Sequence, residues 1–227
     1  MPLRSARSGK ASRDAVHHPL FARYYARISV AAETRMGVGQ VRERLLDGLS
    51  GRVIEIGAGN GLNFAHYPGT VSEVVAIEPE RRLRQLAVEA ALRADVPVDV
   101  VPGAAEALPV KSEGFDAAVV SLVLCSVRDV PRALGELRRV LRPGGEVRFF
   151  EHGRGGGRVM TFSQRALDRT VWPLVSGGCH LAREPVRALR DAGFELGPYR
   201  RMLLPEQGPA LPISYCVLGT AWRPVSS

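Results

Sequence analysis

The sequence predicts a doubly wound α/β sheet of seven strands, mostly parallel, with an antiparallel hairpin at one edge. Short apolar runs rich in Val, Ile and Ala alternate with amphipathic segments, the pattern of strands joined by crossover helices. The run Val53–Ile56 breaks into glycine, as a buried parallel strand does when it enters a tight turn. Two final apolar runs, 194–199 and 213–221, can pair as the edge hairpin.

The predicted elements follow one another regularly along the chain. A helical cap is expected over about 17–50, because its second half, 40–49, places Val and Leu side chains on one face. Arg142–Gly145 predicts a turn before the fifth strand. The first five strands are expected at 53–56, 73–77, 98–101, 115–120 and 147–150. The helices that follow the cap are expected at 62–67, 80–93, 131–141, 161–175 and 183–192.

Length and charge bound the class of protein. The chain has 227 residues, which suits a single domain over 17–227 behind a flexible basic tail over 1–16. Its net charge of +8 could attract a nucleic acid, but the charge comes almost wholly from arginines spread along the chain. We therefore expect no nucleic-acid partner, and an RNA-modifying or nucleic-acid-binding protein remains the alternative from another class.

The sequence shows no sign of a membrane span or of a disulfide framework. Its central apolar stretch is too short for a bilayer, and no signal peptide is expected at the basic N-terminus. Cys125, Cys179 and Cys216 are far apart and form no C-x-x-C pair, so no metal site is expected. A cytoplasmic protein is expected, with peripheral membrane contact and oligomeric state left open.

The turn after the first strand carries the clearest functional signal. It holds Gly57, Gly59 and Gly61, which lack the Cβ atoms that would keep a ligand off the backbone. Leu62 stands where the dinucleotide pattern G-x-G-x-x-G requires a third glycine, which disfavours a nicotinamide-dependent oxidoreductase. Glu78 ends the next apolar run, where a carboxylate in a nucleotide-type site would hold the ribose.

With these motifs, residues 50–222 resemble a class I S-adenosylmethionine-dependent methyltransferase with a Rossmann-like sheet, in its type 11 small-molecule branch. The resemblance implies S-adenosyl-L-methionine as cofactor, with its methionine end on the glycine turn and its adenine on the loop Gly103–Pro109. Ala104 stands where the family often has Asp, so other groups of this loop must hold the base. The implied cofactor-binding residues are Glu55, Gly57, Ala58, Gly59, Gly61, Asn63, Glu78, Pro79, Ala105, Glu106, Ser121 and Leu122.

A narrower resemblance concerns the methyl acceptor. Leu122–Val127, Phe150–His152 and Gly178–Cys179 are similar to the methyltransferase-like alkyl thiol S-methyltransferases of animals. Those proteins carry an N-terminal membrane anchor, and none is expected here. His18–Arg23 and Gly61–Tyr67 resemble bacterial phosphatidylethanolamine and quinone methyltransferases instead. A small-molecule acceptor is implied, and we expect a thiol, with a lipid amine, a quinone or another small metabolite as alternatives.

Methyl transfer aligns acceptor, methyl and sulfur, and it often requires a base for the acceptor's proton. His152 is the first candidate for this base because it follows the fifth strand. Glu151 could orient it, and Asp168 lies in the insert that usually shapes the acceptor pocket in such enzymes. Each has a structural alternative: a carbonyl-capping histidine, a solvated glutamate and an aspartate on a helix surface. Cys125 is expected to be a buried apolar residue, since no covalent intermediate is required.

Overall fold

The computed structural model describes residues 19–225, so the tail expected over 1–16 lies outside the described residues. Five parallel strands form most of one sheet: β1 (Gly51–Ile56), β2 (Val71–Ile77), β3 (Val98–Val101), β4 (Phe115–Ser121) and β5 (Leu141–His152). Two antiparallel strands, β6 (Glu195–Leu203) and β7 (Tyr215–Trp222), complete it. The order is β3-β2-β1-β4-β5-β7-β6, which confirms the predicted doubly wound sheet and its edge hairpin.

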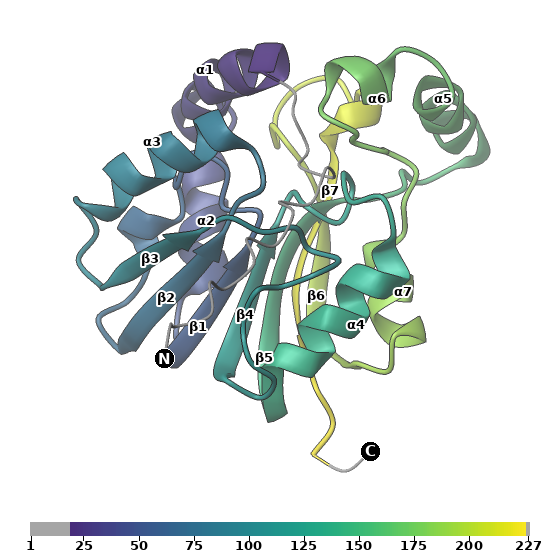
Figure 1. The fold of residues 1–227 in the computed structure, drawn as a ribbon. Helices are drawn as coiled ribbons and strands as arrows, with labels where there is room; N and C mark the ends of the chain where they lie inside the picture. Colours follow the sequence, from purple (N-terminus) through teal and green to yellow (C-terminus); the bar gives the residue numbers. More distant parts are fainter. Residues whose placement is uncertain (1–18, 226–227) are drawn as a thin grey trace, which may run out of the picture.

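Helices cover both faces of this sheet (Figure 1). On one side lie α1 (Pro19–Arg35), α2 (Val38–Leu46) and α3 (Arg81–Ala91), and on the other α4 (Val130–Val140) and α7 (Pro185–Asp191). An insert after β5 holds α5 (Arg158–Asp168) and α6 (Trp172–Val175), and two short 3₁₀ turns, η1 (Phe64–His66) and η2 (Pro212–Ser214), complete the set.

Each strand has apolar residues on both faces because each face has its own core. Ile54 packs toward α4 and α7, in a core that also contains Leu134 and Leu137 of α4. Its neighbour Val53 points the other way, into a core shared with Leu45 of α2. Central parallel strands therefore appear in the sequence as unbroken apolar runs, with no polar side to mark their alternation.

Three predicted elements differ from the structure. The helix expected over 161–175 is divided into α5 and α6, because the Asp168 carboxylate accepts hydrogen bonds from the distant amides of Leu181 and Ala182 at the end of α5. The helix expected over 62–67 is only the three-residue η1, since the segment begins beside a glycine of positive φ and ends before Pro68. The turn at 142–145 is a bulge inside β5, where pairing passes from Leu141 to Glu146.

The carboxyl ends of the parallel strands form the edge where such sheets bind ligands. Figure 1 shows α1, α5 and α6 gathered at this edge. The glycine turn follows β1 there, the segment 122–125 follows β4, and His152 ends β5. Groups that lie far apart in the sequence therefore meet at one rim.

Candidate active site

The glycine turn is wrapped tightly around the end of β2. The amides of Gly57 and Ala58 both donate to the carbonyl of Ile77, at 2.8 and 3.0 Å. Gly57 has a φ of +67°, and a Cβ added there would lie 2.5 Å from a methyl group of Val123, in the segment after β4. Glycine is required here because any side chain would separate the two segments.

Glu78 holds this turn in place from the end of β2. Its carboxylate accepts hydrogen bonds from the backbone amides of Gly59 and Glu80, both at 2.8 Å. The side chain is only 5% exposed, and burial raises the pKa of Glu78 to about 7. The predicted ribose-binding carboxylate therefore also shapes the loop on which the cofactor's methionine end would lie.

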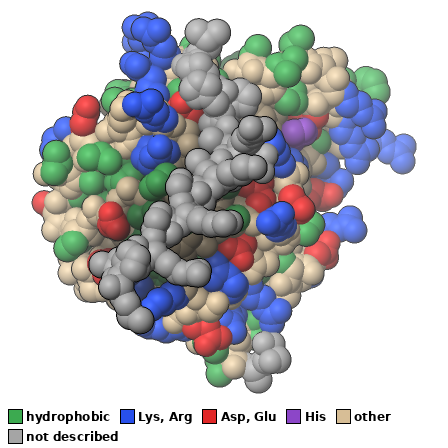
Figure 2. Space-filling view, in the orientation of Figure 1, with side chains coloured by type: hydrophobic (Ala, Val, Ile, Leu, Met, Phe, Trp, Pro, Cys, Tyr) green, Lys and Arg blue, Asp and Glu red, His purple; other side chains and the backbone are tan. Residues whose placement is uncertain are grey.

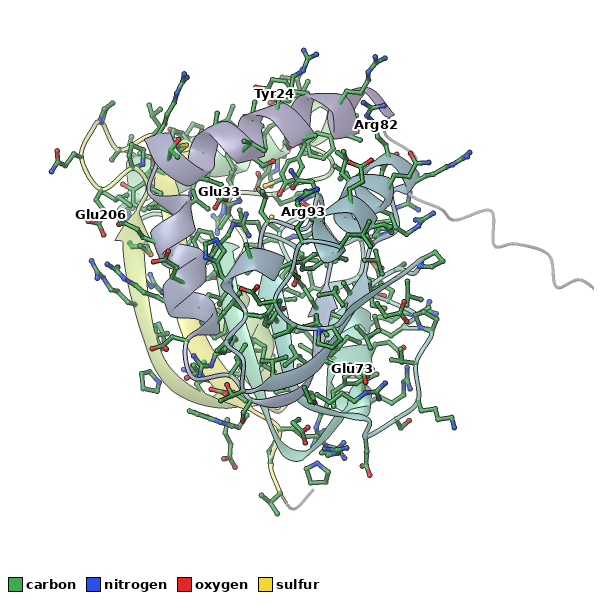
Figure 3. All side chains as sticks on the ribbon, turned by 90° about the vertical axis from the view of Figure 1, so that its left-hand side faces the viewer. Tyr24, Glu33, Glu73, Arg82, Arg93 and Glu206 are labelled. Carbon is green, nitrogen blue, oxygen red and sulfur yellow. The ribbon has the colours of Figure 1, made fainter. Side chains whose placement is uncertain are left out.

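We expect Glu78→Ala to weaken S-adenosylmethionine binding by about 5- to 150-fold, the loss of roughly 1–3 kcal/mol that a charged hydrogen bond gives. Isothermal titration calorimetry measures this directly. Glu73→Ala is the matched control, because Glu73 lies on the same strand but pairs with Arg52 at the opposite end (Figure 3). Equal affinities for Glu78→Ala and the wild type would contradict the assignment.

Glu55 belongs to a buried polar network under the turn. Its two carboxylate oxygens accept from the Asn63 amide at 2.8 Å and from the Tyr67 hydroxyl at 2.7 Å. Arg42 of α2 donates to the Asn63 side-chain oxygen at 2.6 Å and to the Ser121 hydroxyl at 3.4 Å. The structure thus brings together three predicted cofactor residues, Glu55, Asn63 and Ser121, around an arginine that the sequence analysis missed.

Arg42 left one signal in the sequence. It is 6% exposed and stands on the same stripe of α2 as Val38, Val41 and Leu45, where an apolar residue would be expected. Its guanidinium also pairs with the Glu33 carboxylate at 2.7 Å. A charged residue in an apolar stripe indicates a buried partner or ligand.

Burial of two carboxylic acids makes stability depend on pH. Burial is the main cause that raises the pKa values of Glu55 and Glu78 from 4.5 to about 7, so the folded state binds more protons than the unfolded state between these values. Stability should therefore fall as pH rises from 4.5 to 7, by up to about 3 kcal/mol for each group. Urea unfolding at pH 5 and pH 8 measures this, and Glu55→Gln should remove part of the difference. An unchanged pH dependence in that variant would contradict the proposed cause.

α1 covers the glycine turn from outside. The Asn60 side chain donates to the Ser29 hydroxyl at 3.1 Å, and a Cβ added at Gly59 would lie 3.4 Å from the Tyr25 ring. Burial raises the pKa of Tyr25. Figure 3 shows α1 crossing this end of the molecule, with Tyr24 on it and Glu33 near its junction with α2.

Glu151 shapes the segment after β4. Its carboxylate is fully buried and accepts from the amides of Val123 and Leu124, both at 2.8 Å, and from that of Cys125 at 3.3 Å. Burial raises the pKa of Glu151, and these bonds oppose the rise. Among the described residues, no hydrogen bond joins Glu151 to His152, so the suggestion that it orients His152 stays a prediction.

His152 ends β5, where Cys216 is its partner on β7 and the sulfur atoms of Cys125 and Cys179 lie near its ring. Its Nδ1 lies 3.6 Å from Cys179 Sγ, and together with Cys125 Sγ these atoms all lie within 4.8 Å of one another. Burial lowers the pKa of His152, but its interactions with Cys125 and with the Glu151 carboxylate raise it more, so the net shift is upward. The spacing of these residues along the chain gave no sign of the cluster, because the fold alone brings the insert back over β4 and β5.

The remaining predicted site residues mainly hold loops. The Asp168 carboxylate accepts from the amides of Leu181 and Ala182, at 2.7 and 3.0 Å, and so fixes the end of the insert. Glu106 accepts from the Arg128 amide at 2.9 Å, which ties the predicted adenine loop to the segment before α4. Ala105 is buried in that loop.

A pocket of about 220 Å³ opens next to the cysteine–histidine cluster. Cys125 and His152 line it, together with apolar side chains, Arg183 and Glu184, whose carboxylate pairs with Arg154. The Arg183 guanidinium donates to the carbonyls of Leu124 and Val127, so it braces the segment after β4 while it faces the pocket. A second pocket, of about 470 Å³, lies between α1 and α3 beside Gly61.

Comparison with known proteins gives a family match over part of the chain. Residues 54–149, from β1 to β5, match the family described as a methyltransferase domain. A solved structure from Thermotoga maritima, described as an S-adenosylmethionine-dependent methyltransferase and possible histamine N-methyltransferase, shares the fold with a TM-score of 0.65. The two sequences are 23% identical, and the matched region covers 90% of this chain and 98% of the Thermotoga maritima chain.

Curated relatives are named for different substrates, among them thiols, quinones and a tRNA. The human thiol S-methyltransferase TMT1A is 36% identical over 153 residues, 65% of this chain and 62% of the relative. The ubiquinone/menaquinone biosynthesis C-methyltransferase UbiE of Syntrophotalea carbinolica is 29% identical over 154 residues, 66% of this chain and 64% of the relative. The chain therefore spans less than two thirds of either relative's length. In residues 19–225, no helix combines the length and hydropathy that crossing a bilayer requires.

Proposed function

We propose that this methyltransferase transfers the methyl group of S-adenosylmethionine to a small thiol. The observation that carries the proposal is the pocket at the carboxyl edge, where the imidazole of His152 and the guanidinium of Arg183 face one small space. The Arg183 cation favours the thiolate form of a thiol, which is the nucleophile, and a neutral His152 imidazole can accept the thiol's proton. The similarity to TMT1A supports the same acceptor class.

The residues at the glycine turn fit the cofactor. Gly59 lacks a side chain, so a ligand can approach the backbone of the turn closely, while the amides of Gly57, Ala58 and Gly59 donate hydrogen bonds to Ile77 and Glu78. We assign the cofactor's carboxylate to Arg42, whose guanidinium lies between Asn63 and Ser121. The ribose is assigned to Glu78, and the adenine to the loop of Ala105 and Glu106. The backbone at Pro79 and the backbone at Leu122 would border the cofactor on its two sides.

The chemistry requires little beyond alignment and proton removal. The cysteine thiol has a pKa of about 8.5, so an acceptor thiol of similar acidity needs only a modest shift to become a thiolate near neutral pH. In the proposed step His152 takes the thiol proton, sulfur attacks the methyl carbon in line, and the methyl–sulfonium bond breaks. The products are a methyl thioether and S-adenosylhomocysteine. Tyr25 and the rest of α1 would exclude water from the turn.

A second candidate acceptor is an apolar molecule such as a quinone or a lipid amine. The insert exposes large apolar side chains beside the site, with Phe162 of α5 74% exposed and Leu174 of α6 80% exposed. Such side chains would suit peripheral contact with a membrane that holds the acceptor. A nucleic-acid substrate has less support, since basic groups are scattered among acidic ones on the face shown in Figure 2.

An acceptor screen with methyl-labelled S-adenosylmethionine tests the proposal. Small alkyl thiols and hydrosulfide are compared with phosphatidylethanolamine, quinone precursors and RNA. We expect labelled methyl thioethers from the thiols. Cofactor binding without thiol turnover would refute the thiol assignment and leave the family unchanged. Label transfer to RNA, weakened steeply by salt, would favour the nucleic-acid alternative.

A further inference from the structure

The cluster of Cys125, His152 and Cys179 contains two thiols and one imidazole, drawn from three separate parts of the chain. Cys125 follows β4, His152 ends β5 and Cys179 follows α6. Both cysteines are at least 95% buried, with relative exposures of 2% and 5%, and all three ligand atoms lie within 4.8 Å of one another. Two thiolates and one imidazole form a known ligand set for Zn²⁺ at sites that keep a fourth position open.

The distances suit one bound ion. With Zn–S bonds of about 2.3 Å and a Zn–N bond of about 2.05 Å, sulfur and nitrogen in a tetrahedral site lie about 3.6 Å apart. Cys179 Sγ and His152 Nδ1 are 3.6 Å apart. A hydrogen bond between a thiol and an imidazole could explain this one distance. The second thiol, of Cys125, within 4.8 Å of both atoms, is what points to a metal ion.

The surrounding backbone holds the ligands in position before any ion binds. The amide of His180 donates to the Cys125 carbonyl at 2.8 Å, which joins the two cysteine segments directly. Gly178 has a φ of +89°, and a Cβ there would lie 3.1 Å from the Ser126 carbonyl oxygen. The backbone amide of Cys125 also donates a hydrogen bond to the buried Glu151 carboxylate. Such preorganisation of the ligand segments favours tight binding.

The pocket supplies the open position. Cys125 and His152, two of the three ligands, line the pocket of about 220 Å³. On the opposite side the cysteines pack against Leu181, Leu167 and Trp172. The cluster is therefore closed by apolar side chains on one side and reached by a small molecule from the other.

We propose that Cys125, His152 and Cys179 bind one Zn²⁺ ion whose fourth position receives the acceptor thiol. Binding of the ion releases the two cysteine protons to solvent. The acceptor would then coordinate as a thiolate and release its own proton to solvent, its sulfur would attack the methyl carbon, and the methyl–sulfonium bond would break. The neutral thioether leaves and water returns to the ion. His152 then acts as a ligand, and coordination to zinc removes the acceptor's proton in place of the imidazole.

The ion's part in the reaction rests on the proposed thiol methylation, whereas its binding does not. The full chain, purified under a reductant, is expected to bind one Zn²⁺ in a competition titration with a chromophoric chelator. Cys125→Ser and Cys179→Ser should each weaken binding by more than about 100-fold, beyond the 10- to 100-fold that loss of a ligand's hydrogen-bond partner gives. Cys216→Ser is the matched control. Cys216 is also buried and pairs with His152 across β5 and β7, but its sulfur is not one of the three ligand atoms.

Substitution with Co²⁺ gives a second measurement that needs no variant. Sulfur-to-cobalt charge-transfer absorption is expected for the wild type and for Cys216→Ser. Calorimetry with S-adenosylmethionine shows which variants are folded. If Cys125→Ser does not fold, the cobalt spectrum of the wild type decides alone. Absence of stoichiometric metal, wild-type affinity in Cys125→Ser, or a Cys125–Cys179 disulfide in the purified protein would overturn the site.

Activity separates the two proposals. Zinc-dependent methylation of thiols, lost on chelation and restored by Zn²⁺, would support both. Full thiol turnover by zinc-free enzyme would overturn the ion's role and leave the proposed function standing. A zinc-loaded enzyme that methylates no thiol would refute the proposed function, while the measured metal binding would still support the site.

Discussion

His152→Ala is expected to lower thiol methylation by about 10²- to 10⁴-fold, the usual contribution of a positioned acid–base group, while S-adenosylmethionine binding stays near normal. His152 lies at the pocket and within 4.8 Å of two thiols, but it makes no hydrogen bond to the glycine turn among the described residues. Single-turnover rates with labelled cofactor, beside calorimetric affinities, measure the two effects separately.

The matched control for this variant is His66→Ala. His66 is also partly buried, but it lies on η1 with its ring 3.9 Å from Glu43, away from the pocket. We expect its turnover to equal that of the wild type. Normal turnover in His152→Ala would remove this residue from the chemistry, both as a base and as a metal ligand.

Among the proposed variants, Glu151→Ala should destabilise the protein most, with the free energy of unfolding lowered by about 2–5 kcal/mol. The change leaves the amides of Val123, Leu124 and Cys125 without the acceptor that now joins all three. These buried donors lie behind the segment that carries the pocket. Denaturant unfolding followed by circular dichroism measures the loss. Glu151→Gln should lose less stability than Glu151→Ala, because the oxygen of the glutamine side chain still accepts a hydrogen bond.

Glu146→Ala provides the comparison on the same strand. Glu146 pairs with Arg148 at 2.6 Å near the surface of β5, and a pair of this kind contributes only about 0.2–1 kcal/mol. A loss in Glu151→Ala no greater than in Glu146→Ala would contradict the role assigned to the buried carboxylate.

The elements of this fold were predictable where the information is local. Val53–Ile56 followed by glycine specifies a buried strand and a turn within a few residues, and the strand that ends just before Glu78 is marked in the same local way. The edge hairpin also follows from its two apolar runs. The division between α5 and α6 was not predictable, because it depends on where the Asp168 carboxylate finds its partners thirteen residues later.

The candidate site also has parts that the local sequence predicts and parts that depend on distant contacts. The glycine turn and Glu78 belong to a local pattern, so their places could be expected from the sequence. Arg42 stood out only as a charge in an apolar stripe, and the position of Cys179 beside His152 follows only from tertiary packing. Glu151 stood at the expected strand end, yet its partners are backbone amides, which no sequence pattern distinguishes. A side chain's direction at a strand end is set by the neighbouring strand's loop, and sequence spacing does not encode that.

The contact between Gly57 and Val123 has a consequence for the order of events. The glycine turn and the segment after β4 touch directly, with no room for an added methyl group between them. Any adjustment of the turn as the donor arrives must therefore displace the wall of the neighbouring pocket. We expect the donor to bind first and the acceptor second, with S-adenosylhomocysteine the last species to leave from beneath α1.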